Sequence, residues 1–263
     1  MRVHRLTNAL LRRGLLAARA SFDGAWLGIL DHEATHALDE AYYDETRKYT
    51  DEAYNRRGLH DWEREALERF FGGRRRIVVT GAGGGREVLA LLGLGYDAVG
   101  YEPNPGLVEF GAGLLERDGH LERLRHVDRD AWPRDSGPCD GIVVGWGSYM
   151  LIRGRERRVE FLREARARLE PGAPLLLSFF PRTGRPAYLR LVALVGNAVR
   201  RVRRAPPLEF GDAMERNYVH YFDRPEIASE LDEAGFDLVW YDASGYGKAV
   251  GLAGAPLDCR VGH

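Results

Sequence analysis

The sequence predicts an α/β fold that is built around a mostly parallel β-sheet. From residue 75 onward, short apolar runs rich in β-branched residues alternate with amphipathic helical stretches. A cluster of glycines stands between the first run and its helix, and a glycine-rich turn joins the last two runs. Because successive parallel strands need a crossover between them, the alternation indicates βαβ units. The short final turn predicts an antiparallel hairpin at the sheet edge.

The elements follow in order along the chain. Residues 1–72 hold helix formers and many charged residues without strand-like alternation, which predicts a helical cap segment. The last helix begins with "DRPE", where Asp223 can cap the helix and Glu226 can complete a capping box. Strands are expected at 77–80, 98–101, 124–127, 141–144, 174–180, 236–241 and 249–252, and helices at 86–94, 106–117, 156–169 and 224–234.

Composition sets limits on the class of protein. A chain of 263 residues with 44% hydrophobic and 29% charged residues is typical of a globular protein with a sizeable core. A net charge of −1 and the absence of a basic surface interleaved with aromatics argue against nucleic acid as a partner. Two cysteines, Cys139 and Cys259, make no disulfide framework, so a reducing cytoplasm is expected. Arginines at 12, 13 and 19 interrupt the first apolar run, so neither a signal peptide nor a membrane span is expected.

The glycine cluster in "IVVTGAGGGREVLA", residues 77–90, is typical of a strand that leads into a helix around a nucleotide. A dinucleotide fingerprint G-x-G-x-x-G would need a third glycine where Arg86 or Val88 stands, so both registers fail. A phosphate-binding P-loop also fails, because no Gly-Lys-Ser/Thr follows the cluster.

The spacing that fits is G-x-G-x-G, with Gly81, Gly83 and Gly85. Glu102 ends the next expected strand, 21 residues after Gly81. A carboxylate at that place can accept hydrogen bonds from both hydroxyls of an adenosine ribose. The alternative is a tight turn beside an unrelated surface acid.

At these residues the chain resembles the class I S-adenosylmethionine (SAM)-dependent methyltransferases, over about residues 45–253. The resemblance includes "VVTGAGGGREVLALLGLGYDAVGYEPNP", "CDGIVVGWGSYMLI" and "YFDRPEIASELDEAGFDLVWYDASGYGKAVGLA". It implies SAM as the cofactor and a Rossmann-like, seven-stranded sheet with an antiparallel last strand and helices on both faces. The family usually carries an acid two residues before the first glycine, where this chain has Val79. That departure leaves the methionine end of the cofactor to backbone amides, Arg86 or the N-terminal segment.

The resemblance also implies where the cofactor contacts lie. Asp128 and Asp130 are expected near the adenine amine, with solvated loop acids as the alternative. Aromatics of the N-terminal segment are expected over the cofactor, with helix packing as the alternative. The full set of expected contacts is Gly81, Ala82, Gly83, Gly85, Arg86, Glu102, Asn104, Asp128, Asp130, Ala131, Trp146, Tyr49, Tyr54 and Trp62.

Two side chains are candidates for catalysis. Tyr149, in "GWGSYM" after the fourth strand, can offer a hydroxyl to the acceptor, and His220, in "NYVHYF", can act as a general base. For both, the alternative is a packed core residue. His220 lies in the long connection at 181–223, which is expected to form a lid insertion in a SAM-binding domain of residues 73–263. The basic amphipathic run in that insertion, which ends in Arg200, Arg201, Arg203 and Arg204, predicts a lid or dimer helix; an acidic substrate, a membrane surface or a partner is the alternative.

A competing motif is "HEATH", which matches the zinc signature H-E-x-x-H. On a helix, His32 and His36 would lie one turn apart, with Glu33 as a base. The stretch is polar and no glycine-histidine extension follows it, so solvated or packed histidines are expected and no metal.

The function expected from the sequence is transfer of a methyl group from SAM to an oxygen, or second to a nitrogen, of a small-molecule metabolite. A cytoplasmic protein is expected, with a homodimer as one arrangement. Two alternatives stay open: a nicotinamide-dependent Rossmann reductase, and a SAM-binding scaffold without transfer activity.

Overall fold

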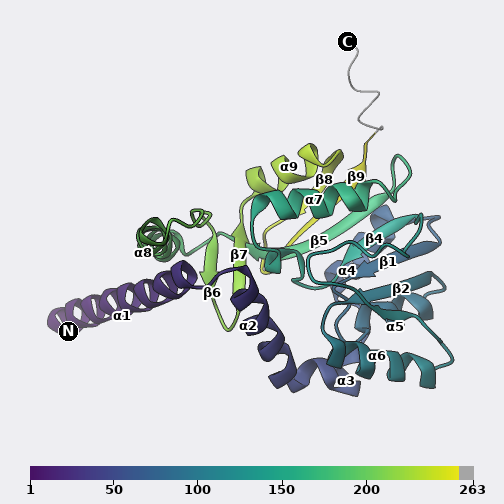
Figure 1. The fold of residues 1–263 in the computed structure, drawn as a ribbon, viewed down its shortest axis with the longest axis horizontal. Coiled ribbons are helices and arrows are strands. Elements are labelled where there is room, and N and C mark those ends of the chain that lie inside the picture. The colour runs from purple at the N-terminus through teal and green to yellow at the C-terminus, as the bar shows by residue number, and fades with distance from the viewer. Residues whose placement is uncertain (255–263) are drawn as a thin grey trace, which may run out of the picture. The chain divides into compact units, whose positions relative to one another are not determined.

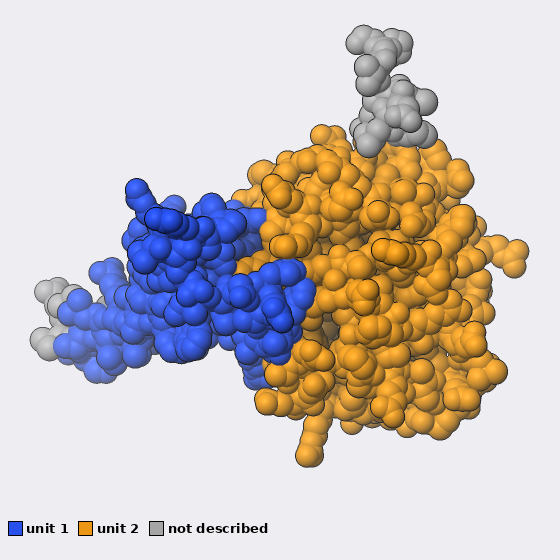
Figure 2. Space-filling view, viewed as in Figure 1, with its two compact units in different colours: residues 1–39, 182–221 blue, residues 40–181, 222–263 orange. Residues whose placement is uncertain are grey.

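The computed structural model of the chain describes residues 1–254 (Figure 1). The chain forms two compact units, coloured separately in Figure 2. Unit 1 comprises residues 1–39 and 182–221, and unit 2 comprises residues 40–181 and 222–263. Cys139 is buried in unit 2, and Cys259 lies outside the described residues. Within the described chain, no helix has the length and apolar character that a membrane span requires.

The sheet of unit 2 confirms the predicted α/β class. Its strands lie in the order β3-β2-β1-β4-β5-β9-β8, and the first five are parallel to one another. The last strand is antiparallel to both of its neighbours, so the predicted hairpin is present and β8 forms the edge. The bounds are β1 Arg76–Thr80, β2 Asp97–Glu102, β3 Leu124–His126, β4 Gly141–Val144, β5 Pro174–Pro181, β8 Phe236–Asp242 and β9 Gly247–Ala253.

Helices flank this sheet at the predicted places, with small shifts at their ends. Asp223 caps α9 as expected, because its carboxylate accepts the amide hydrogen of Glu226 at 3.0 Å. The helix expected at 156–169 ends early, since Leu169 leaves it to form a bridge with Cys139. The bounds are η1 Arg47–Thr50, α3 Glu52–Asn55, α4 Asp61–Phe70, α5 Arg86–Gly93, α6 Pro105–Arg117, η2 Tyr149–Leu151, α7 Arg155–Arg166 and α9 Arg224–Glu233.

Both faces of the sheet are covered. Val79 and Val88 belong to one buried cluster that joins β1 to α5. Gly251 of β9 points to the opposite face, where a Cβ would lie 3.1 Å from the side chain of Leu231 in α9. Gly100 allows the close approach of β2 to α5, because a Cβ there would lie 2.5 Å from Val88 Cγ2. These contacts hold the carboxyl ends of β1 and β2 in register with the start of α5.

Unit 1 combines the first helix with the insertion after β5. It contains α1 (Arg2–Ile29), α8 (Pro186–Arg203) and the antiparallel strands β6 (Asp212–Met214) and β7 (Tyr218–Phe222), while α2 (His32–Glu45) begins in unit 1 and ends in unit 2. Residues 1–39 of the expected cap therefore group with the insertion, and residues 40–72 group with the sheet.

The contact between α1 and α8 depends on small residues. A Cβ at Gly24 would lie 2.6 Å from the carbonyl oxygen of Val192, and one at Gly196 would lie 2.9 Å from the carbonyl oxygen of Gly24. Arg200, from the basic run of α8, donates to the carbonyl oxygens of Leu27 and Leu30 at 3.1 Å each. This arginine is therefore a buried cap of α1 and not part of a charged surface.

Candidate functional site

The glycine loop connects β1 to α5. Gly81, Gly83 and Gly85 have φ values of 61°, 54° and 92°, in the left-handed region that favours glycine. Gly85 is the N-cap of α5. No heavy atom lies within 4 Å of the place a Cβ would take at Gly83, so the space beside the loop is open there. The loop exposes backbone toward this space, as a nucleotide site requires.

Glu102, the last residue of β2, lies beside the glycine loop. Its Oε2 accepts the amide hydrogen of Gly83 at 2.8 Å, and its Oε1 accepts that of Asn104 at 2.9 Å. The side chain is buried, and burial raises the pKa of its carboxyl to about 7. A carboxylate can accept about four hydrogen bonds, so capacity for two further donors remains.

Asn104 organises the backbone beyond Glu102. Its side-chain oxygen accepts the amide hydrogen of Leu107 at 2.9 Å and so caps α6. Its Nδ2 donates to Asp44 at 2.9 Å, which ties the end of α2 to this edge of the sheet.

Part of the N-terminal segment covers the glycine loop within unit 2. A Cβ at Gly84 would lie 2.2 Å from the carbonyl oxygen of Tyr49 and 2.8 Å from Oδ1 of Asn55. Asn55 holds this segment in shape, because its Nδ2 donates to the carbonyl oxygens of Tyr49 and Asp51 at 2.9 Å each. The loop and residues 49–55 therefore pack backbone against backbone.

Gly84→Val is expected to force this segment off the loop. The added carbons have no room beside Tyr49, so we expect a loss of roughly 1–3 kcal/mol of stability and weaker binding of S-adenosylhomocysteine (SAH). Thermal unfolding and calorimetry measure the two effects. Gly72→Val is the matched control, since no heavy atom lies within 4 Å of a Cβ there. Equal losses in both variants would contradict the proposed packing.

Arg86 forms a buried ion cluster. Its guanidinium donates to Glu63 at 2.7 and 2.6 Å, to Glu87 at 2.5 Å and to the carbonyl oxygen of Gly58 at 3.0 Å. Burial alone would lower the pKa of Arg86, but the two carboxylates raise it, so the group stays charged. Burial raises the pKa of Glu87, which also accepts the amide hydrogen of Trp146 at 3.2 Å. In this structure Arg86 holds residues 58–63 to α5, and the expected contact with the cofactor stays a prediction.

An ammonium group lies among the aromatic side chains beside the loop. Lys48 Nζ is 4.5 Å from the ring centroid of Trp146, 4.6 Å from that of Tyr54 and 5.5 Å from that of Tyr49. Partial burial, Arg57 and nearby positive charge lower the pKa of Lys48. These three aromatics are thus brought together as the sequence predicted, around a cation that it did not predict.

Trp62 lies at the rim of the same cluster. Its ring stacks on His60 with centroids 6.3 Å apart, and His60 lies 5.5 Å from Trp146. Burial, together with Arg86, lowers the pKa of His60 to about 4, so its ring is neutral at pH 7. Trp62 also packs against the main core cluster, which is the packing alternative considered for it.

The expected adenine contacts lie in a turn after β3. The amide of Ala131 donates to the carbonyl oxygen of Asp128 at 3.2 Å, and Asp130 has a φ of 56°. Asp128 and Ala131 are exposed. Their roles toward adenine stay predictions.

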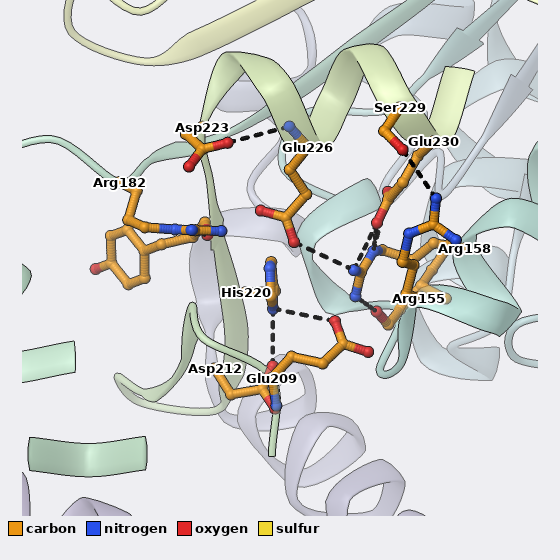
Figure 3. A network of polar contacts seen from close by, with 12 residues as sticks. Arg155, Arg158, Arg182, Glu209, Asp212, His220, Asp223, Glu226, Ser229 and Glu230 are labelled. Atoms are coloured by element: carbon orange, nitrogen blue, oxygen red, sulfur yellow. Dashed lines mark hydrogen bonds and ion pairs between the residues drawn. The ribbon is translucent and has the colours of Figure 1, made fainter. Parts of the chain in front are cut away.

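Tyr149 belongs to a buried network under α9, part of which is drawn in Figure 3. Its hydroxyl donates to Glu230, and Arg158 donates to the same carboxylate at 2.6 Å (Figure 3). Burial and the nearby Glu230 raise the pKa of Tyr149 well above its usual value. The hydroxyl is thus engaged within the core, and its role toward an acceptor stays a prediction.

His220 belongs to unit 1, where β7 pairs with β6. Its Nδ1 lies 2.8 Å from Asp212 and 3.9 Å from Glu209 (Figure 3), and the hydroxyl of Tyr218 donates to Asp212 at 2.8 Å. Burial raises the pKa of Asp212, but the bonds from His220 and Tyr218 lower it further, so this carboxyl stays ionised. An ionised carboxylate on Nδ1 is the arrangement that orients a basic histidine.

The "HEATH" residues lie on α2, as the helical interpretation required. The rings of His32 and His36 have centroids 4.0 Å apart, and both are half-buried, whereas Glu33 is exposed.

Sequence reasoning missed Lys48, Glu63 and Glu87. Lys48 is one of only two lysines in the chain, a signal that was visible in the composition. Glu87 directly follows the glycine cluster in the first turn of α5. Glu63 gave no signal, because its contact with Arg86 bridges 23 residues.

Comparison with known proteins adds the wider context. No protein-family model matches the chain. The chain is 31% identical over 105 residues to an ATP synthase lysine N-methyltransferase of Rattus norvegicus, over 40% of this chain and 45% of that protein. It therefore spans less than half the length of this relative.

Solved structures are similar in fold. A SAM-dependent methyltransferase from Methanosarcina mazei superposes with a TM-score of 0.59 at 16% identity, over 76% of this chain and 100% of that one. A SAM-bound amino pentose methyltransferase from Micromonospora echinaspora superposes with a TM-score of 0.54 at 15% identity, over 76% and 94%. The chain therefore has the fold of the class I SAM-dependent methyltransferases.

Proposed function

We propose that the chain is a SAM-dependent methyltransferase. The observation that carries this proposal is the bond between Gly83 and Glu102, which joins a glycine loop to a buried carboxylate at the end of the next strand. That is the arrangement needed to hold phosphate-free adenosine through its ribose, because the carboxylate retains capacity for two hydroxyl donors. The fold shared with SAM-dependent enzymes supports the same conclusion.

The residues present fit such a cofactor. Glu102 would hold the ribose, and the open backbone at Gly83 would lie against the nucleoside. Thr80, which precedes the loop, has a buried hydroxyl without a partner in the described chain. When bound, the cofactor supplies an electrophilic methyl group on a sulfonium. The chain's task is then to orient an acceptor and exclude water, which can lower a barrier by ~7–11 kcal/mol.

The acceptor is proposed to be an oxygen of a small molecule, with His220 as the base. Asp212 fixes the tautomer and charge balance of His220, which is what proton removal from a hydroxyl needs. A nitrogen acceptor is the second candidate. It is favoured by the ammonium of Lys48 among three aromatic rings, and by relatives named as a lysine N-methyltransferase and an amino pentose methyltransferase.

Calorimetry with SAH and with NADH tests the cofactor. We expect SAH to bind and NADH not to bind, because Arg86 stands where a dinucleotide site needs its third glycine. Binding of NADH alone would overturn the proposal in favour of a reductase. A screen of metabolite fractions with methyl-labelled SAM then separates an enzyme from a SAM-binding scaffold.

His220→Ala is expected to lower turnover at least about tenfold with an oxygen acceptor, while the dissociation constant for SAH stays unchanged. The reason is that proton removal is lost and the glycine loop is left intact. Asp212→Asn should produce a smaller loss in the same direction. Equal turnover at saturating acceptor would remove His220 from the mechanism.

A further inference from the structure

The environment of Lys48 differs from that of an ordinary surface lysine. Its side chain is partly exposed, yet its ammonium lies within 5.5 Å of three ring centroids, those of Tyr49, Tyr54 and Trp146. Within the described chain no carboxylate pairs with it. Aromatic rings grouped around an alkylammonium form the kind of cage that recognises lysine and methyl-lysine.

This cage lies at the end of the sheet where a ligand is expected. Tyr49 packs its carbonyl oxygen on Gly84 of the glycine loop. Trp146 follows β4 closely, and its amide donates to Glu87 in the first turn of α5. β1 and β4 are adjacent and parallel, and the chain order reverses between them. In open α/β sheets, this switch point is where ligands bind.

We propose that Lys48 is a methylation site of the chain itself, with the cage of Tyr49, Tyr54 and Trp146 presenting its ε-amino group to the methyl donor. The inference rests on the proposed function, because it needs SAM at the glycine loop. The lone pair of Nζ forms a bond to the methyl carbon, and the carbon–sulfur bond breaks with its electrons retained on sulfur. The nitrogen releases one proton to solvent, and SAH is the second product.

Two further observations support Lys48 as the acceptor. Methyl transfer needs the neutral amine, and partial burial beside Arg57 and Arg86 lowers the pKa of Lys48. An aromatic cage also retains a methylated ammonium, since the cation–π attraction persists when methyl groups replace hydrogens. The modification is thus expected to stay in place once it has formed.

The chain contains a natural control. Its other lysine, Lys248, is held by Asp242 at 3.0 Å, at the start of β9. An ion pair keeps that amine protonated, so it is not nucleophilic. Lys248 should therefore stay unmodified under conditions that methylate Lys48.

The experiment incubates the full chain with methyl-labelled SAM, without any other acceptor, and maps the label by peptide mass spectrometry. Wild type, Lys48→Arg and Lys248→Arg are compared, and calorimetry with SAH is run on each. We expect label on Lys48 in wild type and in Lys248→Arg, and none in Lys48→Arg. The rate per molecule should not change on dilution. In a second readout, SAH should slow the reaction of Lys48 with acetic anhydride several-fold and leave Lys248 unchanged.

The outcomes separate the two proposals. If SAH binds but Lys48 carries no methyl group, or if both lysines are labelled equally, the inference about Lys48 is overturned and the proposed function stands. A labelling rate that rises with protein concentration also overturns it, because the transfer then occurs between molecules. If SAH fails to bind any of the three proteins, the proposed function itself is wrong.

Discussion

Glu102→Gln is expected to weaken SAH binding roughly 10- to 100-fold at pH 8 without destabilising the fold. The loss follows because two hydrogen bonds to a charged acceptor become bonds to a neutral amide, which are each about half as strong. The carboxylate is buried and already accepts the amide hydrogens of Gly83 and Asn104. Calorimetry with SAH measures the affinity, and denaturant unfolding measures the stability.

The stability of the same variant should depend on pH in the opposite sense to most acids. The pKa of Glu102 is about 7 in the fold, above its ordinary value of 4.5. The native state therefore binds more protons than the unfolded chain between these pH values, so stability is lost as the pH rises. The loss for wild type amounts to about 3 kcal/mol by pH 8. Glutamine cannot ionise, so this loss should be absent in Glu102→Gln.

The affinity for SAH should change with pH in wild type only. Ionisation of Glu102 near pH 7 creates the stronger acceptor, so wild-type affinity should rise between pH 6 and pH 8. The variant should bind weakly at both values. Asp97→Asn at the exposed start of β2 is the control and should leave SAH binding unchanged at both values. A parallel rise in wild type and Glu102→Gln would show that Glu102 does not bind the ribose.

The sheet and the glycine loop were predictable because their signals are local. Alternation of strands and helices, the spacing of Gly81, Gly83 and Gly85, and the cap at Asp223 each lie within a few residues of one another. These patterns state which backbone conformation is needed, so the sequence alone places them.

The division into units was not predictable in the same way. The pairing of residues 1–39 with 182–221 depends on Gly24 and Gly196, which come together from distant parts of the chain. The cage around Lys48 likewise combines residues nearly 100 positions apart, Lys48 and Trp146. Such contacts leave no periodic pattern, because each partner is placed by a different element.

Arg86→Met is expected to lower the free energy of unfolding by about 3–5 kcal/mol at pH 8. Glu63 and Glu87 would stay buried without their counter-charge, and an uncompensated buried charge carries this cost. Denaturant unfolding measures the change. Arg69→Met is the matched control, because Arg69 pairs with Glu65 on the exposed side of α4 and should cost under about 1 kcal/mol.

The sign of the pH dependence tests the cause. Without Arg86, the pKa of each buried carboxyl lies above that of the unfolded chain, so the variant loses stability as the pH rises and recovers part of it at pH 5. Neutralising both acids, in Arg86→Met with Glu63→Gln and Glu87→Gln, should restore most of the stability at pH 8. A loss that is equal at pH 5 and pH 8 would point to a packing defect instead.

The same three variants separate a structural role of Arg86 from the contact with the cofactor that the sequence suggested. If Arg86 only ties residues 58–63 to α5, the triple variant regains SAH affinity together with stability, since the covering segment returns to the loop. If the guanidinium binds the methionine carboxylate of the cofactor, stability returns but SAH affinity does not. Because Val79 replaces the acid that the family usually carries, this outcome decides how the chain holds the methionine end.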